Sequence, residues 1–273
     1  MKLRFTKMSG AGNDFILLGP EYAPLAGRLS EIARAMCPSH VAVGADGLIL
    51  VERTGSGLFM HYVNSDGSEA SFCGNGARCL VLYCGAKGIA SGRVTFRSKS
   101  GVHVGEVVPE GIKVDMKAPS LVREITVAVA ADGPRQTDYH VHLVDAGVPH
   151  AVIFADDVDS VDVEGLGRRV RHHAAFGPEG ANVDFIDSSG REPFRLRTYE
   201  RGVEQETLAC GSGCLAGALV LRLKHLAGDS VSLRVTSGDV LTVGFSPDGQ
   251  AGLTGPAAIV FEGEMDLKEL DHV

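Results

Sequence analysis

Two cysteines stand at the start of glycine-rich segments in this chain of 273 residues. The first opens the segment Cys73-Gly-Asn-Gly, and the second opens Cys210-Gly-Ser-Gly. An apolar segment follows each, which predicts a helix that begins directly after the cysteine. The start of a helix presents unpaired backbone N–H groups and a partial positive charge, so it attracts anions and favours a thiolate over a thiol. The sequence therefore predicts two activated thiols, each beside an anion site.

Two thiols at anion sites suit the inversion of a stereocentre. This reaction removes a proton from one face of a carbon and returns a proton to the other face, so it needs two opposed acid/base groups. The Cα proton of an amino acid is weakly acidic, and hydrogen-bond donors at a carboxylate would stabilise the developing enolate. Pyridoxal phosphate could serve instead, but the sequence shows no lysine-bearing phosphate site. We therefore expect an amino-acid substrate and no cofactor.

The cysteine segments belong to a longer internal repeat. Cys73 and Cys210 are separated by as many residues as Gly101 and Gly238, which lie in the similar segments "FRSKSGVHVGEVV" and "LRVTSGDVLTVGF". Such self-similarity predicts two homologous units. We expect an N-terminal half over 1–118, a C-terminal half over 119–262, and a tail, 263–273, that packs on the first half.

Alternation of apolar and polar residues predicts that both halves consist mainly of strands in antiparallel or mixed sheets. The helices after the two cysteines are more apolar and are expected to pack inside a sheet. Amphipathic surface helices are predicted around "LSEIARAM" and "VEGLGRRVRHH". The predicted fold class is α+β.

Composition argues against several other classes of protein. The net charge is −8 and no run of Lys or Arg occurs, so a nucleic-acid partner is not expected. No apolar stretch approaches the roughly 20 residues that span a membrane, and no signal peptide is recognisable, which predicts a cytoplasmic protein. The six cysteines include no C-x-x-C pair, so we expect reduced thiols and no metal site.

Six segments together resemble the diaminopimelate epimerases, cofactor-independent isomerases that interconvert LL- and meso-diaminopimelate in lysine and peptidoglycan precursor biosynthesis. The segments are "KMSGAGNDF", "VGADGLILV", "NSDGSEASFCGNGARC", "GVPHAVIF", "GANVDFI" and "YERGVEQETLACGSGC". The resemblance implies two pseudo-symmetric domains, each a mixed sheet curled round a central helix, with the active site in the interdomain cleft. It also implies a homodimer.

The resemblance assigns roles to particular residues. Cys73 and Cys210 would be the two acid/base thiols, assisted by His150 and Glu200. The carboxylate at the reacting centre would bind at Gly74, Asn75, Gly211 and Ser212. The substrate's amino groups and distal carboxylate would be held by Asn13, Asn64, Asn182, Glu200 and Arg201.

Considered without the resemblance, several of these residues have structural alternatives. Asn13 and Asn64 lie in turn-rich segments, where asparagine commonly serves the backbone. Arg201 has the planar fork that suits a carboxylate, but it could form an ion pair with Glu204 or Glu206. His150 could be a satisfied polar residue, and Glu200 could be a charge at the end of a strand.

The chain departs from the family pattern at Val148, where many members have asparagine. Valine cannot donate to a distal carboxylate. The loop "ERGVEQETLACG" is one residue longer than usual, and Gly47 replaces a glutamine of some relatives. Two other functions therefore stay open. One is a related racemase or epimerase for proline or hydroxyproline, and the other is a non-catalytic, redox-responsive thiol-pair protein. Arg201, Asn64 and Asn182 favour a long substrate with a second charged end.

Overall fold

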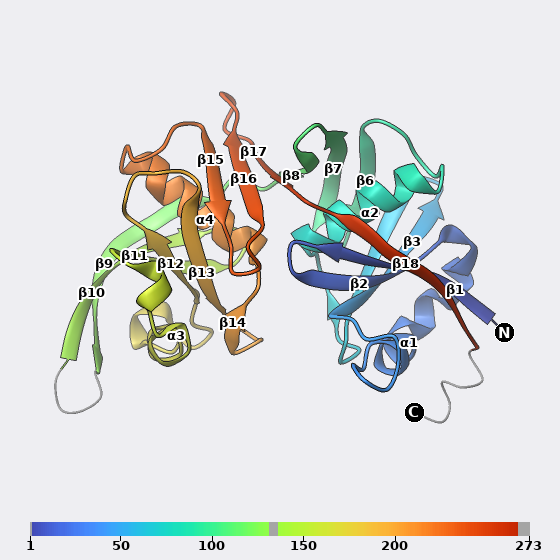
Figure 1. Cartoon of the computed structure of the whole chain (residues 1–273), viewed down its shortest axis with the longest axis horizontal. Helices are drawn as coiled ribbons and strands as arrows, with labels where there is room; N and C mark the ends of the chain where they lie inside the picture. Colours follow the sequence, from blue (N-terminus) through green and yellow to red (C-terminus); the bar gives the residue numbers. More distant parts are fainter. Residues whose placement is uncertain (1, 131–135, 267–273) are drawn as a thin grey trace. The chain divides into compact units, whose positions relative to one another are not determined.

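The protein contains two compact units, shown in a computed structural model that describes residues 2–130 and 136–266. The first unit comprises the chain up to Asp115 together with the segment that begins at Gly255, and the second unit comprises Met116–Thr254. Strands dominate both units (Figure 1). Mixed sheets with few helices confirm the predicted α+β class.

The elements of the first unit are β1 (Lys2–Gly10), β2 (Asn13–Leu18), η1 (Pro20–Arg28), α1 (Leu29–Met36), β3 (Gly47–Thr54), β4 (Gly57–Asn64), β5 (Glu69–Ala70), α2 (Gly74–Ala86), β6 (Val94–Ser98), β7 (Gly101–Val108), β8 (Gly111–Met116) and β18 (Ala258–Asp266). Those of the second unit are β9 (Ser120–Ala130), β10 (Gln136–Asp145), β11 (Pro149–Ala155), η2 (Val158–Ser160), α3 (Val163–Arg171), η3 (Ala174–Phe176), β12 (Asn182–Asp187), β13 (Phe194–Glu200), β14 (Gln205–Thr207), α4 (Gly211–Leu223), β15 (Ser230–Arg234), β16 (Val240–Phe245) and β17 (Ala251–Gly255).

The two units repeat one strand topology. In the first unit β18, β1, β2, β3 and β4 pair in that order, with β2–β3 parallel and the other pairs antiparallel. In the second unit β9, β10, β11, β12 and β13 pair in the same way, with β11–β12 parallel. The next strand joins by parallel pairing in both units, β4–β6 and β13–β15. The internal repeat seen in the sequence is thus a repeat of topology.

The predicted end of the C-terminal half at residue 262 is wrong, because β18 belongs to the first unit. This strand pairs antiparallel with β1 from Ala258 to Asp266 and occupies the place that β9 takes beside β10. An unpaired edge strand exposes a row of N–H and C=O groups, and β18 supplies the partner for β1. The chain therefore leaves the second unit near Gly255. Of the predicted tail, residues 263–266 lie in β18, and residues 267–273 lie outside the described part of the chain.

Helices pack on both faces of each sheet. In the first unit, Leu48 and Leu50 of β3 belong to the cluster that contains Ile32 of α1. The side chain of Ile49 points the other way, since successive residues of a strand alternate in direction, and a Cβ on Gly76 of α2 would lie 2.8 Å from it. Burial on both faces explains why β3 reads as the continuous apolar run "LILV".

The second unit has the same layers. Val183 and Phe185 of β12 pack in the cluster that contains Val170 of α3. Ile186, on the alternate face, lies beside Gly217 of α4. Helices α2 and α4 are therefore the central helices, and α1 and α3 cover the outer faces of the sheets (Figure 1). This arrangement holds the start of each central helix in a fixed place.

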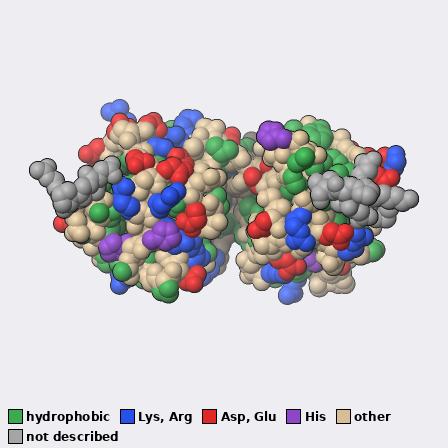
Figure 2. Space-filling view, turned by 90° about the horizontal axis from the view of Figure 1, so that it is seen from below, with side chains coloured by type: hydrophobic (Ala, Val, Ile, Leu, Met, Phe, Trp, Pro, Cys, Tyr) green, Lys and Arg blue, Asp and Glu red, His purple; other side chains and the backbone are tan. Residues whose placement is uncertain are grey.

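The surface carries mixed charge. On the face shown in Figure 2, Lys and Arg side chains lie among Asp and Glu side chains rather than in one basic patch. Among the residues that the structure describes, no helix is long and apolar enough to cross a membrane.

Candidate active site

Both candidate cysteines occupy the position immediately before a central helix. Cys73 and Cys210 have extended backbones, with φ of −141° and −118°, and α2 and α4 begin at the following glycine. The amide of Ala77 donates to the carbonyl oxygen of Cys73 at 2.8 Å, and that of Cys214 donates to the carbonyl oxygen of Cys210 at 3.0 Å. The helical ladder therefore starts at the cysteine, and the N–H groups of the glycine-rich first turn lie outside it.

The Cys210 thiol is buried against the first turn of α4. Its Sγ lies 3.4 Å from the Gly213 nitrogen and 3.4 Å from Ser212 Oγ. Burial raises the pKa of Cys210 well above its ordinary value, and the charges of Glu200 and Asp184 raise it further, whereas the bonds to Ser212 and Gly213 lower it. The expectation that the helix start favours the thiolate is wrong for Cys210, because burial and two nearby carboxylates outweigh the helix-terminal donors.

A buried polar network holds His150. Its Nδ1 lies 2.7 Å from Asp184 Oδ2, and its Nε2 lies 3.2 Å from Asn182 Nδ2. Thr198 donates from Oγ1 to Asp184 Oδ1 at 2.7 Å, and Arg201 donates its backbone N–H to Asn182 Oδ1 at 2.7 Å. His150 and Asp184 are completely buried. A carboxylate on one ring nitrogen fixes the orientation of the imidazole.

Asp184 is the functional candidate that sequence reasoning missed. It lies in the apolar strand β12 and connects His150, Thr198 and, through its charge, Cys210. The signal was a single acidic residue inside "GANVDFI", where the flanking Val183 and Phe185 are buried and nothing nearby in the sequence identifies its partner. A buried carboxylate without partners is costly, so an aspartate in such a strand indicates a polar network.

Glu200, at the end of β13, has a perturbed carboxyl group. Burial raises its pKa above the ordinary value, and the charge of Asp184 acts in the same direction. The nearby Thr207 hydroxyl and the neighbouring His150 oppose the rise. The charge of Glu200 raises the pKa of Cys210, and both groups retain protons more strongly than exposed groups of their kind. Such pairs of perturbed groups are typical of acid/base sites.

The guanidinium of Arg201 is only loosely engaged. Its Nη1 lies 3.8 Å from the carboxylate of Glu179, whose side chain is 85% exposed. The two glutamates considered as alternative partners are bound by other arginines. Glu204 pairs with Arg171 at 3.0 Å, and Glu206 pairs with Arg197 at 2.7 Å. The fork of Arg201 therefore stays accessible to a carboxylate ligand.

In the first unit, the start of α2 is held by an asparagine pair. Asn75, which is 3% exposed, donates from Nδ2 to Asn13 Oδ1 at 2.6 Å and accepts from Arg78 at 2.8 Å. Asn13 in turn donates to Asp46 Oδ2 at 2.8 Å. The structure thus brings two predicted substrate-binding amides, Asn13 and Asn75, into direct contact.

The other predicted residues of this unit lie nearby in the fold. Gly74 opens α2, and the half-buried Cys73 precedes it. Asn64 ends β4, where its Nδ2 donates to Ser68 Oγ at 3.0 Å within a tight turn. This contact is the structural role expected of a turn asparagine. The side-chain oxygen of Asn64 takes no part in that contact. The candidates of the first unit are Asn13, Asn64, Cys73, Gly74 and Asn75, and the remaining candidates belong to the second unit.

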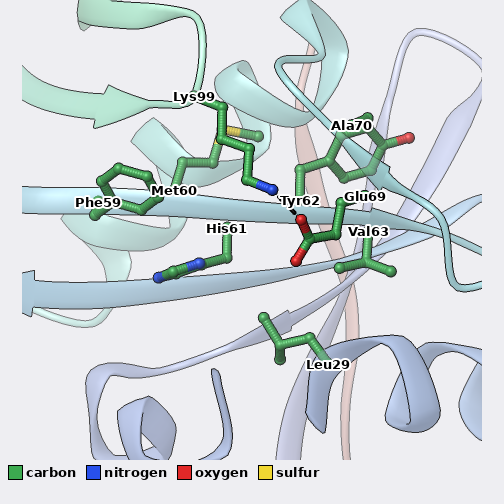
Figure 3. A pocket seen from close by; sticks show the side chains of 9 residues that line it. All are labelled: Leu29, Phe59, Met60, His61, Tyr62, Val63, Glu69, Ala70 and Lys99. Atoms are coloured by element: carbon green, nitrogen blue, oxygen red, sulfur yellow. Dashed lines mark hydrogen bonds and ion pairs between the residues drawn. The ribbon is translucent and has the colours of Figure 1, made fainter. Parts of the chain in front are cut away.

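A small hollow beside β5 does not serve this site. It is lined by Leu29, Phe59, Met60, His61, Tyr62, Val63, Glu69, Ala70 and Lys99, and the ion pair between Lys99 and Glu69 lies across it (Figure 3). Its volume of about 10 Å³ is room for about one water molecule. Glu69 therefore has a structural role here, as its repeat counterpart Glu206 has in pairing with Arg197.

Comparison with known proteins gives matches over nearly the whole chain. The diaminopimelate epimerase family profile matches residues 5–122 and 142–260. The diaminopimelate epimerase of Aquifex aeolicus is 39% identical over 99% of this chain and 100% of its own. That of Chlorobaculum tepidum is 38% identical over 95% of this chain and 100% of its own.

More distant solved structures share the fold. A phenazine biosynthesis protein of the PhzF family from Enterococcus faecalis superposes with a TM-score of 0.73 at 16% identity, over 98% of this chain and 100% of that chain. A hydroxyproline epimerase from Agrobacterium vitis superposes with a TM-score of 0.67 at 15% identity, over 97% and 93%. At this level of identity the likeness concerns the fold alone.

Proposed function

Because the chain belongs to the diaminopimelate epimerase family, as its motifs predicted, we propose that it interconverts LL- and meso-diaminopimelate without a cofactor. Cys73 and Cys210 are the acid/base pair of this proposal. The observation that carries it is the matched placement of both cysteines, each immediately before the central helix of its unit. Two equivalent thiols suit a reaction that treats two faces of one carbon alike.

In one direction Cys73, as thiolate, takes the Cα proton, and the electron pair of the C–H bond moves into the enolate of the substrate carboxylate. Cys210, as thiol, then gives its proton to the opposite face. The raised pKa of Cys210 supports this assignment, because the group is protonated at neutral pH. In the reverse direction Cys210 must lose its proton before it acts as base. Glu200 and the His150–Asp184 pair would receive that proton.

The amides of the two glycine-rich first turns would stabilise the enolate. Donors in Gly74-Asn75 and Gly211-Ser212 would bind the carboxylate at the reacting carbon, where charge increases in the transition state.

The far end of the substrate would be held by Arg201, Asn182, Asn13 and Asn64. Arg201 suits a second carboxylate, because its fork has no close partner among the glutamates of its own loop.

We also infer a cytoplasmic homodimer. The dimer comes from the family resemblance and the location from the pattern of the sequence, and light scattering on the purified protein tests the dimer. A mass near that of the 28.7 kDa chain would contradict the dimer.

The test of function is proton exchange at Cα. Purified protein is incubated in deuterated water with LL-diaminopimelate, without added cofactor, and the Cα–H signal is followed by NMR. We expect loss of that signal together with formation of the meso isomer. L-proline and trans-4-hydroxy-L-proline serve as the comparison substrates, because Val148 leaves the distal specificity open.

Each alternative gives a different result. Faster exchange of either ring substrate than of diaminopimelate would contradict the proposed substrate and favour the racemase alternative. No exchange with any substrate under reducing conditions would contradict enzyme activity. Thiol counting before and after oxidation then tests the redox-responsive alternative.

A further inference from the structure

Three potential metal ligands gather on one face of the strand pair β9–β10. They are Glu124 on β9 and His140 and His142 on β10. His142 is directly opposite Glu124 in the antiparallel register, and His140 is two residues away on the same strand. Residues two apart on a strand point to the same side of the sheet. The two rings and the carboxylate therefore share one face.

The ligand atoms of this cluster are already close. One atom from each of the three side chains lies within 4.8 Å of the others. His140 Nε2 is 3.3 Å and His142 Nε2 is 3.9 Å from the Glu124 carboxylate. Ligands at the zinc bond lengths of about 2.0–2.1 Å stand roughly 3.4 Å apart in a tetrahedron. Movements of about 1 Å would bring all three to a common metal ion.

His142 has unused ring nitrogens. It is 2% exposed, and neither Nδ1 nor Nε2 has a hydrogen-bond partner among the described residues. A buried imidazole normally satisfies both nitrogens, because a buried polar atom without a partner costs free energy. A buried ring nitrogen without a hydrogen-bond partner can bind a metal ion.

Lys224 now occupies part of the place that a cation would take. It is the residue that caps the end of α4, and its Nζ donates to Glu124 Oε1 at 2.9 Å. The end of a helix favours positive charge. A metal ion would replace the ammonium group at the Glu124 carboxylate, so Lys224 should act as a competitor for the site.

From this geometry we propose that Glu124, His140 and His142 form a binding site for a divalent transition metal, most readily Zn²⁺, with water as the fourth ligand. Two imidazoles and one carboxylate are a common zinc ligand set, whereas Mg²⁺ prefers oxygen ligands. The site is distinct from the thiols. Helix α4 has 13 residues, about 20 Å of helix, between Cys210 at its start and Lys224 at its end.

The test is titration of the full-length protein with Zn²⁺ alone at pH 7 by calorimetry. The exposed ligands are changed first, since substitution of buried His142 could prevent folding. We expect Glu124→Gln and His140→Ala to weaken binding at least about tenfold, the loss reported even for outer-shell partners of metal ligands. Lys224→Ala should tighten binding, because it removes the competing cation. All variants retain the six cysteines, so a difference between them reports on this cluster.

His172→Ala is the matched control. His172 is an exposed histidine of the same unit, 3.5 Å from Glu204, and its removal should leave Zn²⁺ affinity unchanged. Mg²⁺ should give no comparable binding. Zn²⁺ binding by Glu124→Gln and His140→Ala as tight as that of the unmodified protein would overturn the proposal. Absence of binding to the unmodified protein at about 1 mM Zn²⁺ would overturn it as well.

Discussion

His150 Nδ1 and Asp184 Oδ2 lie 2.7 Å apart, and neither residue is exposed to solvent. The charge of Asp184 also acts on Cys210, because it raises the pKa of that thiol. One carboxylate thus orients the imidazole and helps to keep the thiol protonated. Asp184 is therefore a positioning residue whose effects can be separated by experiment.

Asp184→Asn should lower the pKa of Cys210 and slow epimerisation. The amide cannot carry the charge that opposes thiolate formation, and it holds His150 less firmly. We expect kcat to fall at least about tenfold, in line with outer-shell partners at other sites. Alkylation of Cys210 by iodoacetamide, followed by mass spectrometry against pH, should begin at lower pH in this variant.

Asp138→Asn is the control for this substitution, because Asp138 is an exposed residue of β10. It should change neither kcat nor the alkylation profile. An unchanged alkylation profile in Asp184→Asn would show that its charge does not act on Cys210, even if the variant lost activity.

Cys73→Ala and Cys210→Ala should each abolish net epimerisation, because each leaves one face of the carbon without a proton carrier. General acid/base groups contribute about 10²–10⁴-fold, and a loss of that size is expected in formation of the meso isomer. Cys214→Ala is the matched control, since Cys214 lies one turn further along α4 and is fully buried. It should retain activity. Normal turnover in either of the first two variants would exclude the two-thiol mechanism.

Gly213→Ala should damage the site through packing. A Cβ at this position would lie 2.5 Å from Asp184 Oδ1 and 3.0 Å from Thr198 Oγ1. Overpacking of this kind costs about 1–3 kcal/mol of unfolding free energy, and displacement of Asp184 should also lower kcat. Urea denaturation and initial rates measure the two effects.

Gly85→Ala, in the equivalent helix α2, should raise the stability of the protein instead of lowering it. A Cβ there meets no atom within 4 Å, and Gly85 is exposed in α2. Alanine is the better helix former, so this variant should gain about 0.5–1 kcal/mol without loss of activity. Equal stability of the two variants would contradict the packing argument.

The protein should lose stability steeply above pH 9. Burial raises the pKa of Cys37, Cys79 and Cys84 to about 12, against an ordinary value of 9.0. Between these values the folded protein keeps protons that the unfolded chain has lost, so the free energy of unfolding falls as pH rises. Each thiol contributes a slope of up to about 1.4 kcal/mol per pH unit. Urea denaturation between pH 8 and 11 measures it.

Cys84→Ser isolates one of these contributions, because serine does not titrate in this range. The variant should be less stable at pH 8 but lose stability more gradually as pH rises. A slope identical to that of the unmodified protein would mean that Cys84 does not contribute to the alkaline transition.

The sequence predicted the central helices well, because two signals agreed there. The glycine-rich turns mark the helix starts, and the repeat places α2 and α4 at equivalent positions, each with 13 residues. The surface helix over Leu29–Met36 followed from its amphipathic pattern. Local chemistry and periodicity were sufficient for these elements.

Partners distant in the sequence were not predictable. The tail from residue 263 was expected to pack on the first half, but no local feature says that a strand begins at Ala258 or that it pairs with β1. Asp184 looks like a single charge in an apolar strand until His150 and Thr198 are seen beside it. The protonation of Cys210 depends on burial and on Glu200, which the helix-start argument did not include.

The place of β18 has a consequence for synthesis on the ribosome. The second unit is translated in full before β18, yet β18 is the strand that pairs with β1 at the opposite end of the chain. Domains generally fold as units while the chain emerges, so here the later unit can finish first. The nascent first unit must wait with the edge of β1 uncovered, at a stage when neighbouring chains on the same messenger could pair with it.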